Sequence, residues 1–231
     1  MESFGQKVIR FHQQLVYTGK KLPEGIRIMN PFRESLKAPA ILEAFAAKFL
    51  HTGDQRHILL GINPGRFGGG ITGIPFTDPK RLKEVCGIPY DGPMAHEPSS
   101  VFIYDMIAAY GGPIDFYNRF YINSPCPLGF VQEKDNGKEV NYNYYDSAAL
   151  TAAARPFMIS SLRNLIALGI FTDTAICLGT GKNVKFLQGL NDEFGFFQKI
   201  IALEHPRYIM QYKSREKHYY IDKYLTALQS M

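Results

Sequence analysis

Four short polar segments, each directly after an apolar run, carry the side chains that could do chemistry. These segments are residues 63–70, 123–128, 179–182 and 204–207. Asn63 and His205 stand out, because an amide oxygen can hold a water molecule and an imidazole can donate a hydrogen bond to a developing anion. Side chains of these two types suit the hydrolysis of a bond whose leaving group departs with negative charge.

The apolar runs before these segments have the length and continuity of strands buried on both faces of a parallel sheet. They cover residues 57–62, 120–122, 174–178 and 200–203. Apolar residues at helical spacing predict helices over residues 39–49, 99–109, 147–168, 183–190 and 216–228. Alternating strands and helices predict an α/β fold, a three-layer α/β/α sandwich around a central, mostly parallel four-stranded sheet. Ligands bind beyond the carboxyl ends of such strands, so the four polar segments are expected to converge on one edge.

The length and composition favour one domain over residues 1–231. The chain has 231 residues, 45% of them hydrophobic, which is enough for a sizeable core. No repeat or low-complexity linker divides it. Residues 89–98 and 130–145 are expected to be loops, the second with an Asn136-Gly137 turn. Loops of this length are often binding elements.

Several classes of protein are disfavoured by the composition. The three cysteines are widely separated and form no Cys-x-x-Cys pair, so we expect no disulfide framework and no zinc or iron–sulfur site. We also expect no other metal and no cofactor. No apolar run is long enough to span a membrane, and the N-terminus lacks the pattern of a signal peptide. We therefore expect a soluble, monomeric, intracellular protein, cytoplasmic or, in a eukaryote, nuclear. The formal net charge of +5 favours a polyanionic partner only weakly.

Two nucleotide-binding patterns fail on inspection. Gly68, Gly70 and Gly73 satisfy G-x-G-x-x-G, but that fingerprint must open directly into a helix, and Pro75 makes the continuation unfavourable. Gly181-Lys182 resembles the end of a P-loop, yet Ile176 stands where its first glycine is required.

The same four segments resemble the motifs of one enzyme family, the single-strand-selective monofunctional uracil-DNA glycosylases. Residues 61–68 and 72–76 resemble the first motif of this family, residues 123–128 its base-reading asparagine segment, and His205-Pro206 its His-Pro motif. Residues 179–182 are similar to its third strand-to-helix loop, so the resemblance spans residues 57 to about 212. The absence of a cysteine cluster disfavours the branches of the superfamily that carry an iron–sulfur cluster.

The resemblance implies a DNA-repair enzyme that hydrolyses the N-glycosidic bond of uracil, or of 5-hydroxymethyluracil, in single- or double-stranded DNA. Asn63 would position the water, and His205 would stabilise the anion of the leaving base. Asn123 would read the base and reject cytosine, and Phe76 would stack on it. The remaining base-binding residues would be Gly61, Ile62, Pro64, Gly65, Phe67 and Gly69.

The DNA itself would contact the segment after His205 and nearby basic side chains. Such enzymes extrude the target nucleotide, and a neighbouring segment braces the gap. The candidate DNA contacts are Arg66, Lys182, Pro206, Arg207, Tyr208, Lys213 and Arg215.

Two other functions stay open at this point. Gly69 stands where relatives carry a bulkier residue, which predicts a looser pocket and allows a deaminated-purine glycosylase (xanthine or hypoxanthine) or a mismatch-directed glycosylase. A catalytically silent nucleic-acid-binding module is the second alternative, since an isolated Asn-Pro-Gly is usually only a turn.

Overall fold

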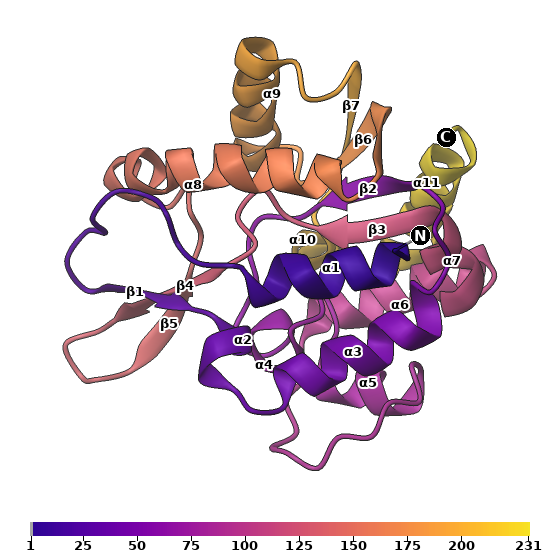
Figure 1. Ribbon diagram of the computed structural model, residues 1–231, viewed down its shortest axis with the longest axis horizontal. Coiled ribbons are helices and arrows are strands. Elements are labelled where there is room, and N and C mark those ends of the chain that lie inside the picture. Colours follow the sequence, from indigo (N-terminus) through magenta and orange to yellow (C-terminus); the bar gives the residue numbers. More distant parts are fainter. Residues whose placement is uncertain (1) are drawn as a thin grey trace.

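Four parallel strands form the central sheet of the computed structural model, which describes residues 2–231 (Figure 1). The strands, in spatial order, are β3 (Phe120–Asn123), β2 (Arg56–Leu60), β6 (Ile170–Leu178) and β7 (Lys199–Leu203). Leu60 of β2 lies opposite Asn123 of β3 and Cys177 of β6, and Leu178 lies opposite Leu203 of β7. The strands therefore end almost level, as the sequence predicts.

Helices cover both faces of this sheet and complete the three predicted layers. In the view of Figure 1, α1 and α8 lie in front of the sheet, while α6, α10 and α11, which pack on one another, lie behind it. The helices are α1 (Phe4–Gln13), α2 (Pro31–Glu34), α3 (Ala38–Phe49), α4 (Gly69–Thr72), α5 (Pro79–Glu84), α6 (Pro98–Tyr110), α7 (Pro113–Arg119), α8 (Ala148–Ala167), α9 (Lys182–Phe194), α10 (Pro206–Tyr212) and α11 (Lys217–Gln229). A 3₁₀ turn, Ser214–Glu216, joins the last two.

The five helices predicted from periodicity are confirmed as α3, α6, α8, α9 and α11. Local chemistry sets the start of α8, where the Ser147 hydroxyl accepts a hydrogen bond from the backbone N–H of Leu150. The glycines at 68–73 form only the single turn of α4, which ends at Gly73 with φ +75°. No long helix follows them, as expected when the dinucleotide-binding fingerprint is rejected.

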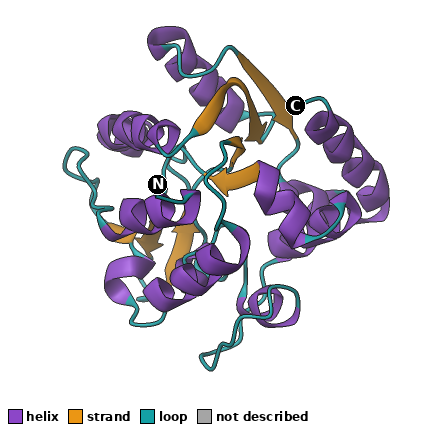
Figure 2. Cartoon of the chain, turned by 45° about the vertical axis from the view of Figure 1, so that its right-hand side comes forward, coloured by secondary structure: helices purple, strands orange, loops and turns teal. Residues whose placement is uncertain are grey.

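A second sheet replaces most of the loop predicted over residues 130–145, so that prediction was wrong. The antiparallel strands β1 (Ile26–Met29), β4 (Gly129–Glu133) and β5 (Glu139–Tyr142) lie beside the central sheet (Figure 2). Asn136-Gly137 does form a turn, with Gly137 at φ +73°. The residues of β5 are largely exposed, so backbone pairing, and not an apolar pattern, forms this strand.

The core lies on both sides of the central sheet. Ile58, Leu59 and Leu60 of β2 are all fully buried, as their continuous apolar run predicts. Helix α1, which the pattern analysis does not predict, packs on α3 and begins with a capping box between Ser3 and Gln6. Within residues 2–231, each helix is too short or too polar to cross a membrane.

Candidate functional site

Two adjoining cavities lie at the carboxyl edge of the central sheet. The outer cleft measures about 260 Å³ and the inner pocket about 30 Å³. His205 lines the cleft, Asn123 lines the pocket, and Asn63 lines both. The two cavities share the wall formed by Ile62, Asn63, Pro64, Gly65, Phe76 and Glu97.

The amide of Asn63 is held in one orientation by the end of β5 and the residues that follow it. Its Oδ1 accepts a hydrogen bond of 3.1 Å from the backbone N–H of Tyr144. Its Nδ2 donates over 3.2 Å to the carbonyl of Tyr142. A carbonyl-type oxygen accepts two hydrogen bonds, so Oδ1 keeps one lone pair for a further donor such as water.

Tyr144 and Asn183 connect this segment to the ends of the central strands. The hydroxyl of Tyr144 donates to Oδ1 of Asn183 over 2.7 Å. The Nδ2 of Asn183 donates to the carbonyls of Gly61 (3.1 Å) and Leu178 (3.0 Å), which follow β2 and end β6. Both side chains are buried. This network ties the Asn63 clamp to the rigid sheet.

Removal of the Tyr144 hydroxyl should destabilise the fold measurably. In Tyr144→Phe, the buried Oδ1 of Asn183 loses its donor, which costs about 1–3 kcal/mol of unfolding free energy. Urea unfolding followed by circular dichroism measures this loss. Tyr219→Phe is the matched control, because Tyr219 is 62% exposed on α11. Equal midpoints for the two variants would contradict the prediction.

His205 caps the start of α10 with its imidazole in the neutral form. The backbone N–H of Arg207 donates to Nδ1 over 3.1 Å, so the proton of the neutral ring sits on Nε2. Burial, reinforced by the positive charge of Arg207, lowers the pKa of His205 to about 4. At neutral pH the ring therefore has Nε2–H as its donor, and the residue lines the cleft.

Phe76 occupies a strained backbone position over the pocket. Its φ of +52° makes it the one non-glycine residue with positive φ among residues 2–231. The turn is closed by the N–H of Thr77, which donates to the carbonyl of Ile74 over 3.2 Å. A Cβ on Gly61 would come within 3.0 Å of the Phe76 ring, so glycine allows this close approach. Strain of this kind often marks a functional position.

Asn123 presents a donor and an acceptor side by side in the inner pocket. Its Nδ2 donates to the hydroxyl of Tyr121 over 2.9 Å, and its Oδ1 accepts from the N–H of Ser124 over 2.8 Å. One N–H and one lone pair remain on this buried amide. Such a pair can read one edge of a planar ring.

The other predicted base-binding residues divide into two groups. Ile62, Pro64 and Gly65 line both cavities, and Gly61 and Gly69 line the inner pocket. Phe67 lines neither cavity: it is 49% exposed, and its ring lies 5.2 Å from the guanidinium of Arg66.

The predicted DNA contacts also divide. Arg207 and Tyr208 are exposed and line the cleft, and Pro206 is buried as the first residue of α10. Lys182 lies 5.8 Å from the ring of Tyr145, another cleft residue. The remaining basic candidates, Arg66, Lys213 and Arg215, line neither cavity.

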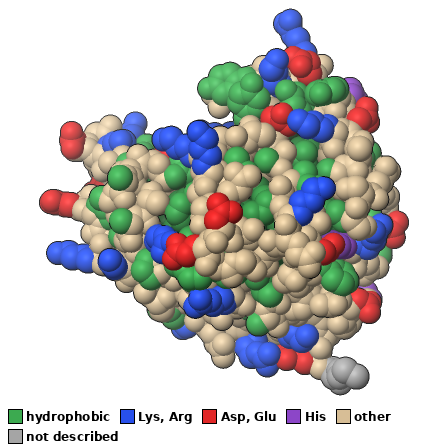
Figure 3. Space-filling model, turned by 90° about the horizontal axis from the view of Figure 1, so that it is seen from above, with side chains coloured by type: hydrophobic (Ala, Val, Ile, Leu, Met, Phe, Trp, Pro, Cys, Tyr) green, Lys and Arg blue, Asp and Glu red, His purple; other side chains and the backbone are tan. Residues whose placement is uncertain are grey.

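Charge alone does not mark the DNA-binding surface. Lys213 is paired with Glu216 over 2.9 Å. On the face seen from above in Figure 3, basic side chains are interspersed with acidic ones and do not form one stripe. The charges on this face therefore do not mark out a DNA-binding stripe.

The sequence pattern does not indicate several of the residues that line the cleft. They are Glu97, Ser99, Asn141, Asn143, Tyr145, Gln211 and Tyr212. Asn141, for example, accepts a hydrogen bond of 2.9 Å at Oδ1 from the N–H of Arg66. The Asn136-Gly137 turn was the available signal, since a hairpin there returns residues 141–145 towards Asn63.

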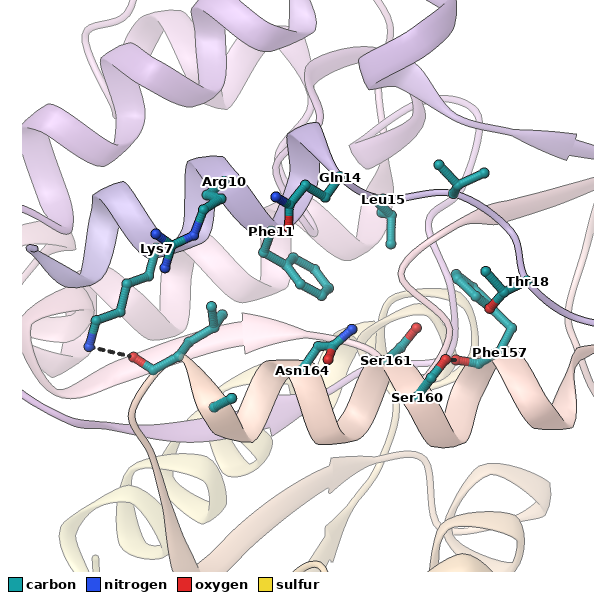
Figure 4. A pocket seen from close by; sticks show the side chains of 13 residues that line it. Lys7, Arg10, Phe11, Gln14, Leu15, Thr18, Phe157, Ser160, Ser161 and Asn164 are labelled. Atoms are coloured by element: carbon teal, nitrogen blue, oxygen red, sulfur yellow. Dashed lines mark hydrogen bonds between the residues drawn. The ribbon is translucent and has the colours of Figure 1, made fainter.

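A larger hollow of about 400 Å³ lies between α1 and α8 (Figure 4). Lys7, Arg10 and Asn164 are among its lining residues, and none of these residues lines the cleft. The nitrogen of Lys7 donates to the carbonyl of Leu168 over 3.3 Å.

Across residues 2–231, no three His, Cys, Asp or Glu side chains are grouped as metal ligands would be.

Comparison with known proteins identifies the family of the chain. The profile described as the uracil DNA glycosylase superfamily matches residues 47–229. No curated protein matches the chain. A crystal structure of wild-type SMUG2 from Pedobacter heparinus is 58% identical, with a TM-score of 0.98 over 100% of this chain and 98% of that one. The profile covers the strand ends that carry Asn63, Asn123 and His205. The chain belongs to the uracil-DNA glycosylase superfamily and is a DNA glycosylase, an enzyme that hydrolyses N-glycosidic bonds.

Proposed function

We propose that the protein excises uracil, and 5-hydroxymethyluracil, from DNA by a monofunctional hydrolysis that leaves an abasic site. One observation carries the proposal: the clamped amide of Asn63 and the neutral imidazole of His205 line one cleft, beside the pocket that holds Asn123. The extruded base would occupy this space, with its sugar nearest Asn63.

Asn63 positions the attacking water. An amide is too weak a base to deprotonate water, so Asn63 accepts a hydrogen bond from the water through the free lone pair of Oδ1. The hydrogen bonds to Tyr142 and Tyr144 prevent the amide from turning. The glycosidic bond therefore breaks ahead of water attack, and positive charge develops on the sugar.

His205 stabilises the leaving base. The pyrimidine departs with negative charge, which Nε2–H meets at O2 by donating a hydrogen bond. A neutral imidazole serves this purpose without a proton transfer, because the donor is already in place as the charge forms. The N–H of Arg207 on Nδ1 holds the ring in the required tautomer.

Asn123 distinguishes uracil from cytosine. Its free N–H donates to O4 of uracil, and its free lone pair accepts from N3–H. Cytosine presents an amino group and a bare N3 at these positions, so both contacts would be mismatched.

The base reaches the pocket by extrusion from DNA. The target atom is inaccessible in a duplex, so the nucleotide is flipped or taken from a single strand. The inner pocket holds about the share of one water molecule. The base would therefore lie across the outer cleft and pocket together, with Arg207 and Tyr208 next to the gap in the DNA.

Incubation with uracil-containing DNA, followed by alkaline cleavage, tests the proposal. A strand break at the uracil position is expected, and none in an identical cytosine oligonucleotide. Breaks confined to xanthine, hypoxanthine or mismatched thymine would show that the enzyme excises one of these bases and not uracil, as a different glycosylase of the same superfamily. No break in any oligonucleotide, with DNA binding retained, would identify a silent binding module.

Loss of the Phe76 ring should slow excision with little effect on folding. Base–aromatic stacking contributes about 1–3 kcal/mol, so Phe76→Ala should lower the single-turnover efficiency about 5- to 150-fold. Phe67→Ala is the matched control, because Phe67 lies outside both cavities. Equal effects of the two substitutions would show that Phe76 does not stack on the base.

A further inference from the structure

Glu97 lies where the outer cleft meets the inner pocket, directly before α6. It lines both cavities, together with Asn63 and Gly65. Its carboxyl packs onto the backbone of the first motif. A Cβ atom added to Gly65 would lie 3.3 Å from Oε1 of Glu97, and a Cβ atom added to Gly68 would lie 2.0 Å from Oε2. Side chains at these two positions would displace it, so the glycines of the motif make room for this carboxyl.

The carboxyl of Glu97 has an unused hydrogen-bonding oxygen. Oε2 is buried and has no hydrogen-bond partner in the part of the chain that the structure describes. The neighbouring carboxylate of Asp78 is satisfied instead, by Arg81 over 3.2 Å and by the backbone N–H of Glu97 over 3.0 Å. Unpaired buried polar atoms are uncommon, and each one calls for an explanation. Oε2 itself packs against Gly68, which lines neither cavity, but Glu97 as a whole lines both, so a ligand bound there can supply its carboxyl with a donor.

The charges around Glu97 come from two neighbouring elements. Burial, and then the negative charge of Asp78, raises the pKa of Glu97 to about 7, while Arg207 of α10 opposes the rise. Asp78 also faces Arg81 and, over 3.7 Å, Nδ1 of His96. His205 contributes no charge at neutral pH. Glu97 is thus partly ionised at neutral pH, and both of its forms can accept a hydrogen bond.

The arrangement of the other contacts selects the edge of the base that Glu97 faces. With the sugar at Asn63, O2 at His205 and N3 and O4 at Asn123, the edge left over is the one that carries C5. Pro64, Gly65 and Glu97 line both cavities and take part in none of these contacts, so we assign this part of the wall to the C5 edge. Gly65 contributes no side chain there, so a substituent on C5 has space beside the carboxyl.

We propose that Glu97 determines specificity at C5 of the base, by accepting a hydrogen bond from a hydroxyl group carried on that carbon. The inference rests on the proposed excision of uracil, and it assigns to Glu97 the selection of 5-hydroxymethyluracil. A methyl group at the same place would exclude water from the carboxyl without offering it a donor, which disfavours thymine.

Two substitutions of Glu97 test this role. Single-turnover excision of 5-hydroxymethyluracil and of uracil is measured in the same oligonucleotide for the wild type, Glu97→Leu and Glu97→Gln. The ratio of the two rates should fall about tenfold or more in Glu97→Leu, since a buried acceptor is lost. Glu97→Gln keeps an acceptor oxygen and should keep most of the ratio. Glu43→Leu, an exposed glutamate on α3, is the matched control.

A pH series gives a second readout that does not depend on the stability of Glu97→Leu. A carboxylate accepts more strongly than a neutral carboxyl or an amide. The ratio should therefore rise with pH through about 7 in the wild type and stay flat in Glu97→Gln.

The outcomes separate this inference from the proposed function. Absence of uracil excision by the wild type would defeat the proposed function itself. A wild type that excises uracil but not 5-hydroxymethyluracil would overturn the role of Glu97. So would an unchanged ratio in a folded Glu97→Leu, or, if that variant does not fold, the same pH dependence in the wild type and Glu97→Gln.

Discussion

Asn63→Ala should excise uracil at least about 10²-fold more slowly than the wild type, because misplacing a reacting group by even 1 Å costs about that much. The substitution removes the oxygen that holds the water, together with the clamp to Tyr142 and Tyr144. DNA affinity should change little, since phosphate contacts dominate it. Single-turnover excision and fluorescence anisotropy measure the two quantities separately.

Asn164→Ala is the control for this substitution. Asn164 has the same side chain, but it lines the hollow between α1 and α8 and lies outside the cleft. Its excision rate should equal that of the wild type. An Asn63→Ala enzyme that is as fast as the wild type would show that another group positions the water.

His205→Ala should lower the single-turnover rate about 10²- to 10³-fold, the typical effect of removing one preorganised donor to a developing anion. His205→Gln should recover part of the rate, since its amide can still donate. The effect should fall on the rate of excision and spare DNA binding, because His205 lines the cleft in which we propose that the base binds. Equal rates for His205→Ala and the wild type would remove the imidazole from the mechanism.

The low pKa of His205 gives this role a pH signature. With a pKa of about 4, the ring stays neutral above roughly pH 5, so uracil excision should not fall as the pH rises from 6 to 8. A loss of rate centred near pH 6.5, the usual pKa of histidine, would instead indicate a catalytic imidazolium.

The low pKa of His205 also affects stability. The folded state binds the proton less tightly than the unfolded chain, so the contribution of His205 to stability is complete above about pH 6.5 and is lost as the pH falls towards 4.

The sequence predicted the central fold mainly because the inner part of the sheet, above all β2 and β3, is buried on both faces. Apolar runs such as the one over residues 57–62 leave few alternatives to a parallel sheet, and the structure buries Ile58, Leu59 and Leu60 completely. Parallel strands end at one edge, so the placement of Asn63, Asn123 and His205 followed from the chain order alone.

The remaining features depend on contacts between distant residues, which periodicity does not reveal. Strand β5 is mainly polar and exposed, and it is formed by backbone pairing with β4. Tyr144 reaches Asn63 only because this hairpin folds back, and Asn183 joins them from the start of α9. Glu97 gains its position from residues 65–68, about thirty positions earlier in the chain. The Asn136-Gly137 turn is the one local signal for Tyr144, and no local pattern marks the roles of Asn183 and Glu97.

The placement of the extruded base is tested most directly by a crystal structure of Asn63→Ala bound to uracil-containing DNA. Slow hydrolysis in this variant should preserve the intact nucleotide. The base should lie against Phe76, with O2 about 2.7–3.1 Å from Nε2 of His205 and the N3–O4 edge on Asn123. A uracil bound elsewhere on the protein, or one left stacked in the DNA above an empty cleft, would contradict the proposed mechanism.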